Sequence, residues 1–228
     1  MAPTIIFLAL FLCLALLPQM WITRVIERHS GERSEYPGTG GEFARHLLDE
    51  MKLDHVKVEE TKLGDHYDPE AKVVRLTAER FNGKSLAAVV IAAHEVGHAM
   101  QDATDYAPLR ARTRLAKRAA AIEKFGAIVM MAAPIIMVLA KSPIILVFEI
   151  LAGILILGMT IFMHAVTLPV EFDASFRRAM PVLKAGNYVN ERDIGSAREL
   201  LRAAAFTYVA AAAMSLFDVM RWLRILRP

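Results

Sequence analysis

The chain has 228 residues, of which 55% are hydrophobic and 22% are charged, and its mean hydropathy is +0.37. These values are high for one soluble domain and favour a membrane protein with a modest polar domain. The single cysteine, Cys13, excludes disulfides within the chain and zinc sites built from cysteines. The formal net charge of +3 is better explained by basic residues facing a cytoplasmic membrane surface than by nucleic acid, so no nucleic-acid partner is expected.

A transmembrane anchor is predicted at residues 1–23. Residues 3–22 carry no charge, and such a run is about long enough to cross the hydrocarbon core of a bilayer. A signal peptide would have a basic segment before the apolar run and a small-residue cleavage site after it, and this sequence has neither. Arg24 and Arg28 follow at once, which places the C-terminal end of the anchor in the cytoplasm.

The next elements are a helix and two strands. Thr39 and Glu42 have the spacing of a capping box, which predicts a helix that runs to about Met51. Alternating apolar and polar residues predict strands at 55–61 and 72–76. If the second strand formed a sheet edge, it would bind a peptide substrate as an additional strand.

Residues 65–69 connect these strands and read D-H-Y-D-P, a composition typical of a turn. His66 and Tyr67 could donate hydrogen bonds to a tetrahedral intermediate if this turn faced a catalytic site. A tight turn with exposed polar side chains is an equally compatible interpretation.

The strongest motif lies in a predicted buried helix at residues 85–101. His94, Glu95 and His98 form H-E-x-x-H, and two histidines four apart on a helix can provide two ligands of one Zn²⁺. Glu95 is adjacent to the first histidine, where a carboxylate can accept a proton from the attacking water. The alternative is a core helix whose histidines only form hydrogen bonds.

A transmembrane hairpin is predicted at residues 119–170, because uncharged runs flank a break at Lys141. All Lys and Arg residues except Lys141 then lie on one side, which by the positive-inside rule is the cytoplasm. An alanine-rich helix is predicted at 199–226. Its charge-free part, 203–217, is followed by arginines. This favours a helix that packs on the bundle or lies at the membrane interface, although the sequence leaves open that it crosses the membrane.

A catalytic zinc needs a third protein ligand and one open position. The metzincin pattern is absent, because Gln101 and Thr104 stand where it requires glycine and histidine. The acidic candidates that remain are Glu123, Glu171 and Asp173. Glu171 is favoured because it follows an apolar run directly, and Pro169 is expected to break the helix and turn this carboxylate toward the polar domain.

Four stretches together resemble a known family. They are D-H-Y-D-P at 65–69, A-A-H-E-V-G-H-A-M-Q at 92–101, Y-A-P-L-R at 106–110 and T-L-P-V-E-F-D-A-S at 167–175. In this combination the chain resembles the YugP-type bacterial membrane zinc metallopeptidases and, more distantly, the HtpX membrane proteases.

The resemblance implies a gluzincin that holds one Zn²⁺ per chain with His94, His98 and Glu171 and uses Glu95 as the base. Enzymes of the HtpX type carry aspartate where this chain has Ser175, so a supporting role beside the metal is assigned to Asp173 as a hypothesis.

The expected fold is a mainly α membrane protein, a helical transmembrane bundle with a small α+β zincin-like cytoplasmic metallopeptidase domain. The predicted segments are an anchor at 1–23, the polar domain at 24–118, the hairpin at 119–170 and a cytoplasmic or interfacial helical region at 171–228.

The sequence therefore predicts a multi-pass protein of the bacterial inner membrane that hydrolyses peptide bonds at the cytoplasmic face. Its expected partners are the lipid bilayer and protein or peptide substrates, membrane proteins included. The alternative function is a membrane scaffold or adaptor with a structural zinc. A fourth protein ligand, with His66 the obvious candidate, would favour that alternative.

Overall fold

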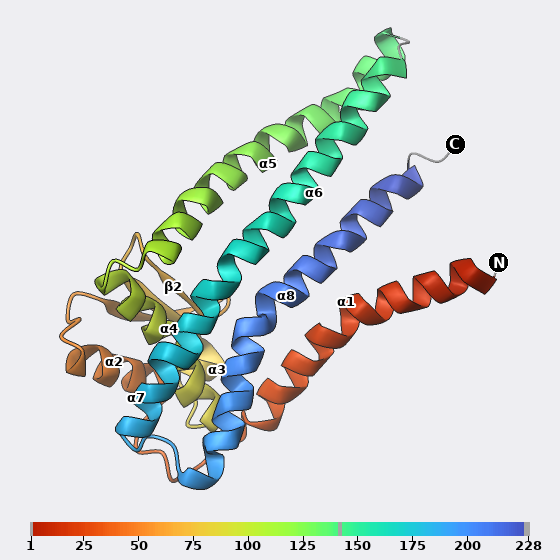
Figure 1. Ribbon diagram of the computed structural model, residues 1–228. Coiled ribbons are helices and arrows are strands. Elements are labelled where there is room, and N and C mark those ends of the chain that lie inside the picture. Colours follow the sequence, from red (N-terminus) through yellow and green to blue (C-terminus); the bar gives the residue numbers. More distant parts are fainter. Residues whose placement is uncertain (1, 141–142, 226–228) are drawn as a thin grey trace.

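The computed structural model describes residues 2–140 and 143–225, and in the outer parts of the long helices it describes the backbone and only some side chains. Figure 1 shows long helices that extend from one end of the molecule, where the short helices and the sheet gather. The long helices are α1 (Ala2–Arg28), α5 (Ala107–Ala140), α6 (Pro143–Phe172) and α8 (Ile194–Ile225).

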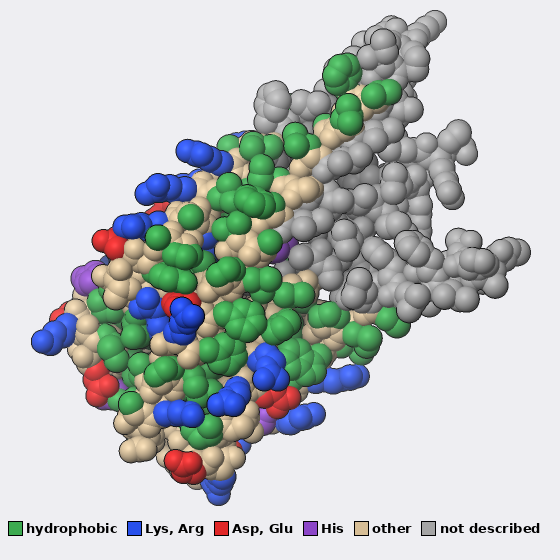
Figure 2. All heavy atoms as spheres, in the orientation of Figure 1, with side chains coloured by type: hydrophobic (Ala, Val, Ile, Leu, Met, Phe, Trp, Pro, Cys, Tyr) green, Lys and Arg blue, Asp and Glu red, His purple; other side chains and the backbone are tan. Residues whose placement is uncertain are grey.

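The gathered end, called here the compact end, contains all the remaining elements. They are α2 (Gly40–Glu50), β1 (Lys57–Thr61), β2 (His66–Asp68), β3 (Val73–Thr77), α3 (Ala78–Phe81), α4 (Leu86–Ala103), the π-helix η1 (Asp173–Ala179), α7 (Met180–Ala185) and the 3₁₀-helix η2 (Glu191–Asp193). Its core includes fully buried leucines from three helices, Leu47, Leu183 and Leu200. Figure 2 shows Lys and Arg side chains over this end, whereas the described side chains farther along the molecule on this face are mostly hydrophobic.

The predicted capping box and its helix are confirmed in α2. The hydroxyl oxygen of Thr39 accepts a hydrogen bond from the Glu42 backbone N–H at 3.3 Å, and the Glu42 carboxylate accepts one from the Thr39 N–H at 2.7 Å. Leu47 and Leu48 are buried on the opposite side of this helix from solvent. Two backbone donors that a helix start leaves unpaired are thus satisfied, and α2 packs against α4.

The two predicted strands are confirmed as β1 and β3, but the prediction that 72–76 could form a sheet edge is wrong. The strand order is β1-β3-β2, with β1 parallel and β2 antiparallel to β3. The expected turn at 65–69 contains β2, and Tyr67 pairs with Val74. The turn comes later, where the Asp68 carboxylate accepts hydrogen bonds from the N–H groups of Glu70 and Ala71. β2 is therefore one edge strand of the sheet, and β1 is the other.

Helix α6 does not break at Pro169, contrary to the prediction, and continues to Phe172. A proline inside a helix removes one backbone hydrogen bond and crowds the preceding turn. Here the regular helix ends three residues later, and the π-helix η1 begins at once. Because a π-helix has a wider turn, the change in geometry is taken up at η1 and not by a break.

The long helices pack side by side, α5 against α6, α6 against α8 and α8 against α1. The predicted C-terminal helix is present as α8, which starts at Ile194, earlier than expected. It packs on α1 and α6. Residues 141–142, at the predicted hairpin break, and residues 226–228 lie outside the described residues.

The predicted transmembrane bundle is wrong for the part of the chain that the structure describes. Within residues 2–140 and 143–225, no helix is both long and apolar enough to cross a membrane. The prediction relied on runs without charged residues, and absence of charge is a weaker criterion than the sustained apolar length that a crossing helix needs. The boundaries of the four predicted segments are not tested independently and stay a prediction.

Helix α4 and η1 approach each other closely at Gly97. A Cβ atom placed on Gly97 would lie 2.7 Å from the backbone oxygen of Ala174, closer than real Cβ atoms come. A backbone oxygen cannot rotate away as a flexible side chain can. Glycine is therefore required at this position for α4 and η1 to pack as they do.

We expect Gly97→Ala to destabilise the fold by about 1–3 kcal/mol, because the added methyl group forces two backbones apart. Thermal or denaturant unfolding of the purified protein measures this change. Gly195→Ala is the matched control: nothing lies within 4 Å of a Cβ at Gly195, so we expect equal or slightly higher stability. Equal stability of the two variants would contradict the close approach.

Candidate metal centre

Helix α4 brings three chemically active side chains into the interior. Its start is capped by Ser85, whose hydroxyl oxygen accepts a hydrogen bond from the Ala88 N–H at 3.1 Å. His94, Glu95 and His98 are exposed by only 3%, 6% and 6%. The two imidazole rings lie one turn apart, with centroids 4.8 Å from each other. Buried polar groups of this kind need partners, and the partners come from distant segments.

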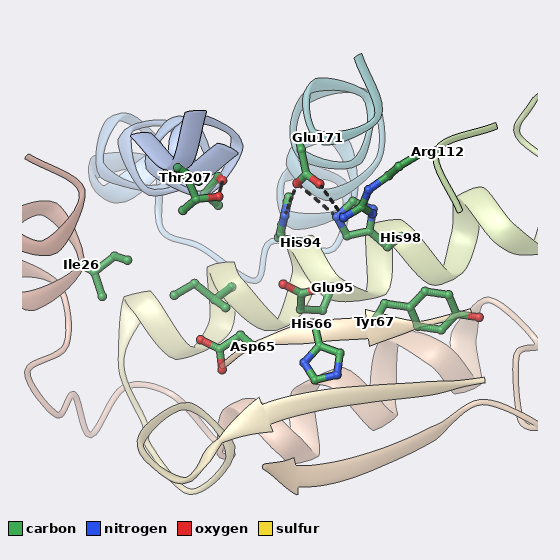
Figure 3. Close-up of a pocket in the computed structure, with 13 residues that line it drawn as sticks. Ile26, Asp65, His66, Tyr67, His94, Glu95, His98, Arg112, Glu171 and Thr207 are labelled. Atoms are coloured by element: carbon green, nitrogen blue, oxygen red, sulfur yellow. Dashed lines mark hydrogen bonds and ion pairs between the residues drawn. The ribbon is translucent and has the colours of Figure 1, made fainter. Parts of the chain in front are cut away.

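Glu171, near the C-terminal end of α6, meets both histidines. Its Oε2 atom lies 3.2 Å from His94 Nε2 and 3.3 Å from His98 Nε2, as Figure 3 shows. Candidate ligand atoms of these three residues all lie within 4.8 Å of one another. The structure thus brings together the three residues predicted as zinc ligands.

The orientation of the His98 ring is fixed by Gln101. The Gln101 Nε2 donates to the Val170 carbonyl at 2.8 Å and to Asp173 Oδ2 at 2.9 Å. Since both partners are acceptors, the amide nitrogen must face them, and Gln101 Oε1 faces His98 Nδ1 at 2.9 Å. An oxygen acceptor there requires His98 Nδ1 to carry the proton.

Ser175 fixes the His94 ring in the same way. Its hydroxyl donates to the Leu201 carbonyl at 3.2 Å, which leaves an oxygen lone pair for His94 Nδ1 at 3.0 Å. His94 therefore donates from Nδ1 as well. Gln101 lies within one turn of His98, and Ser175 lies within one turn of Glu171.

These hydrogen bonds determine what the site can hold. With Nδ1 protonated, a neutral imidazole presents a bare lone pair at Nε2, and here two such lone pairs face one carboxylate oxygen. Three acceptors this close repel one another unless a cation lies among them. In a tetrahedral zinc site with bonds of about 2.0–2.1 Å, ligand atoms are about 3.3–3.4 Å apart. The residues present therefore fit zinc.

The Glu171 carboxyl is held ionised. It is 2% exposed, and burial opposes ionisation, but His98 and His94 outweigh that effect when their Nε2 atoms carry a proton, and they then lower the pKa of Glu171 below its usual range. Its second oxygen, Oε1, is buried without a hydrogen-bond partner among the described residues. The guanidinium group of Arg112 lies 3.9 Å from Oε1. This cation at the edge of the site also favours the ionised carboxylate.

Glu95 does not join the candidate ligands and has a different electrostatic environment. Its pKa is raised to about 7, mainly by burial and also by the nearby carboxylates of Glu171 and Asp65, while a protonated His94 acts in the opposite direction. A carboxyl with this pKa can both accept and release a proton near neutral pH.

A cavity of about 410 Å³ opens beside these residues, and His94, Glu95, His98 and Glu171 line it. The edge strand β2 and the residue before it contribute Asp65, His66 and Tyr67 to its wall (Figure 3). The cavity therefore places the candidate ligands, a carboxyl group and the edge of a sheet next to one another.

The predicted transition-state contacts differ in their placement. His66 lines the cavity, and its Nδ1 lies 2.8 Å from the Gly64 carbonyl. The Tyr67 hydroxyl donates to Asp102 at 2.6 Å, and in Figure 3 it points away from Glu95. The structure therefore brings His66 to the cavity but turns the Tyr67 hydroxyl elsewhere.

Asp173 is not part of the His94–His98–Glu171 group. Asp173 accepts hydrogen bonds from Gln101 and from Arg178, the latter at 2.8 Å. These bonds outweigh burial and lower the pKa of Asp173. Asp173 thus acts on His98 through Gln101, as a supporting residue would. The side chain of Glu123 lies outside the described residues.

Sequence reasoning missed the roles of Gln101, Ser175 and Arg112. Two of these roles could have been predicted from sequence spacing. Gln101 is three residues after His98, and Ser175 is four residues after Glu171, so each pair lies on one helix face. Arg112 comes from α5, a separate helix, and the sequence shows it only as one member of a basic segment.

A buried H-E-x-x-H helix that meets a glutamate from a later helix defines a candidate metal centre of the zinc-hydrolase class. The chain belongs to the family described as "Putative neutral zinc metallopeptidase", whose profile matches residues 4–227. A relative in Bacillus subtilis (strain 168), named "Putative membrane protease YugP", is 35% identical over 205 residues, which cover 87% of this chain and 85% of the relative. No solved structure matches this chain.

We expect Gln101→Leu to weaken zinc binding by about 10- to 100-fold, because the His98 Nδ1 and the groups around Val170 and Asp173 lose their common partner. Competition with a fluorescent zinc chelator measures the affinity. Ser85→Ala is the control, since it removes the α4 cap and lowers stability without touching the imidazoles. Equal zinc affinity of Gln101→Leu and the wild type would exclude this role.

Proposed function

We propose that this protein is a zinc metalloendopeptidase of the gluzincin type, with one Zn²⁺ per chain held by His94, His98 and Glu171. The observation that carries the proposal is that two imidazole lone pairs converge on one buried carboxylate oxygen. Membership of the zinc metallopeptidase family supports it.

When bound, Zn²⁺ supplies Lewis acidity, which makes water a stronger acid and polarises a peptide carbonyl. The Glu95 carboxylate accepts a proton from the attacking water and returns it to the leaving amine. Its burial keeps bulk water from competing for this proton, and its position next to His94 holds it beside the metal ligands.

We propose that the substrate binds in an extended conformation along β2. This strand pairs only with β3 in the described sheet, so no strand among the described residues pairs with its other edge. Its residues His66 and Tyr67 line the same cavity as Glu95. Backbone pairing with an edge strand would place a peptide across the candidate metal ligands.

The alternative, a scaffold with a structural zinc, requires a closed site with four protein ligands. Among the described residues, the group of candidate ligands contains three members and His66 is not one of them. Three ligands and an adjacent carboxyl group favour catalysis.

We expect Glu95→Gln to reduce cleavage of an unfolded test protein such as casein by at least about a hundredfold while one zinc per chain is retained. Glutamine has the size of glutamate but cannot accept the proton. The measurement compares wild type and variant by cleavage rate and by zinc content. A variant that retains wild-type activity would exclude Glu95 as the base.

Glu171→Ala is the complementary test to Glu95→Gln, because it removes a proposed ligand and leaves the proposed base in place. Its zinc content should fall well below that of the wild type, with activity falling in parallel. Glu123→Ala tests the alternative third ligand and should keep both zinc and activity. Zinc loss in the Glu123 variant alone would assign the third ligand to Glu123.

We further propose that the protein acts in association with a membrane, as the name of its Bacillus subtilis relative suggests for that relative. Large apolar side chains are exposed along three helices, among them Leu17 of α1, Met131 of α5 and Leu155 of α6, with exposed fractions of 56%, 73% and 68%. Exposed apolar surface of this kind marks an interaction site. The location in the inner membrane and the orientation of the site toward the cytoplasm stay predictions.

We expect the protein to sediment with washed membranes, to remain there at high salt and to be released by detergent, because apolar contacts are not screened by salt. Immunoblots of the fractions provide the measurement. Release by high salt alone would mean that charge, and not the apolar side chains, holds the protein.

A further inference from the structure

The cavity beside the candidate metal centre has two ends of different character. Figure 3 shows Arg112 on one side of Glu95, and Ile26 and Thr207 on the other. Helices α1, α4 and α8, which carry Ile26, Ile91 and Thr207, contribute two isoleucines and three small residues to the lining of the cavity. This wall, called here the α1–α8 compartment, consists of Ile26, Ile91, Ala204, Thr207 and Ala211.

Helix α8 uses small residues where it faces the cavity and a large one where it packs on its neighbours. Ala204, Thr207 and Ala211 are three and four residues apart and so lie on one face. Phe206 of the same helix packs its ring against Phe172 at 5.8 Å and against Trp21 at 6.5 Å between centroids. Space is therefore left specifically beside the candidate metal centre.

The charges around the compartment favour an uncharged occupant. None of its five residues carries a charge. Asp65 is the acidic residue at this end in Figure 3, and its Oδ1 already accepts hydrogen bonds from the N–H and hydroxyl of Thr77, at 2.6 and 3.0 Å. Ile91 is 6% exposed, so the compartment ends against the apolar side of α4.

We propose that the α1–α8 compartment binds a large apolar side chain of the substrate, such as Leu, Met or Phe, at a residue adjoining the bond that is cleaved. A peptide extended along β2 alternates its side chains between two faces, and one face would direct a side chain into this compartment. The inference rests on the proposed peptidase function and names the class of peptide that the site selects.

The test uses quenched fluorescent peptides that differ only in the residues adjoining the cleaved bond, which are Ala, Leu, Phe, Lys or Asp. At one of these positions, the wild type should show kcat/KM at least about tenfold higher for Leu or Phe than for Ala, since each methylene in an apolar pocket contributes a factor of about ten or more. A preference for Lys would assign the subsite to Asp65 and overturn the proposal, as would equal rates for all peptides.

Two variants test whether the α1–α8 compartment is the binding site. Ala211→Leu fills the compartment and should reduce kcat/KM for the Leu peptide at least tenfold relative to the Ala peptide. Thr207→Asp introduces a carboxylate and should raise kcat/KM for the Lys peptide relative to the Leu peptide at least tenfold, a gain that misfolding cannot produce. Ala116→Leu, an exposed site on α5 outside the cavity, is the matched control and should keep the wild-type preference.

A binding measurement separates this inference from the proposed function. Fluorescence anisotropy of labelled peptides with Glu95→Gln should show tighter binding of the Leu peptide than of the Ala peptide. The same order with no cleavage by the wild type would refute the peptidase function but retain the compartment. Cleavage that depends on Glu95, with no preference in rate or binding, would retain the function and overturn the compartment.

Discussion

The contact between α4 and the α6–η1 segment is the constraint on which the rest of this structure depends. It buries two imidazoles and a carboxylate together, each 6% exposed or less, and such burial is favourable only if every polar group has a partner. Gln101 and Ser175 satisfy the two Nδ1 atoms. The Nε2 atoms and the Glu171 carboxylate are left to share a cation. The hydrogen bonding thus points to a cation site independently of the motif.

The same contact explains two features that would otherwise be costly. Gly97 has low helix propensity, yet its missing side chain lets the Ala174 backbone approach within contact distance. The π-helix at Asp173–Ala179 is a rare conformation, and its residues include both Ser175 and Asp173. π-helical turns are frequent at functional sites, and here one aims a hydroxyl at His94 and a carboxylate at Gln101 from a single segment.

The sequence predicted the parts of this site that depend on local spacing. The capping box of α2, the strands at β1 and β3 and the H-E-x-x-H helix all follow from patterns over a few residues. The sheet order did not follow, because a three-residue strand such as β2 has no periodicity to detect and D-H-Y-D-P resembles a turn. The predicted effect of Pro169 was also wrong, because a local pattern does not contain the tertiary packing of α6, such as its contact with α8. The prediction of a transmembrane bundle was wrong because runs without charge were equated with membrane spans.

The meeting of His94, His98 and Glu171 was predicted from the sequence. The place of Arg112 beside them was not, because Arg112 comes from a helix whose direction the sequence does not specify.

The position of Glu95 distinguishes a catalytic from a structural site. A structural zinc needs its ligands and nothing more, and a carboxyl group buried beside it costs free energy, as the raised pKa of about 7 for Glu95 reflects. An apolar residue would fit the same buried helix face without that cost. A cost of this kind at one residue, inside a cavity and next to three candidate ligands, is typical of a catalytic group and not of core packing. The small residues of α8 agree with this interpretation, because they leave space in the cavity wall that larger side chains would fill. The costly carboxyl and the open wall thus border one cavity, where a substrate would bind.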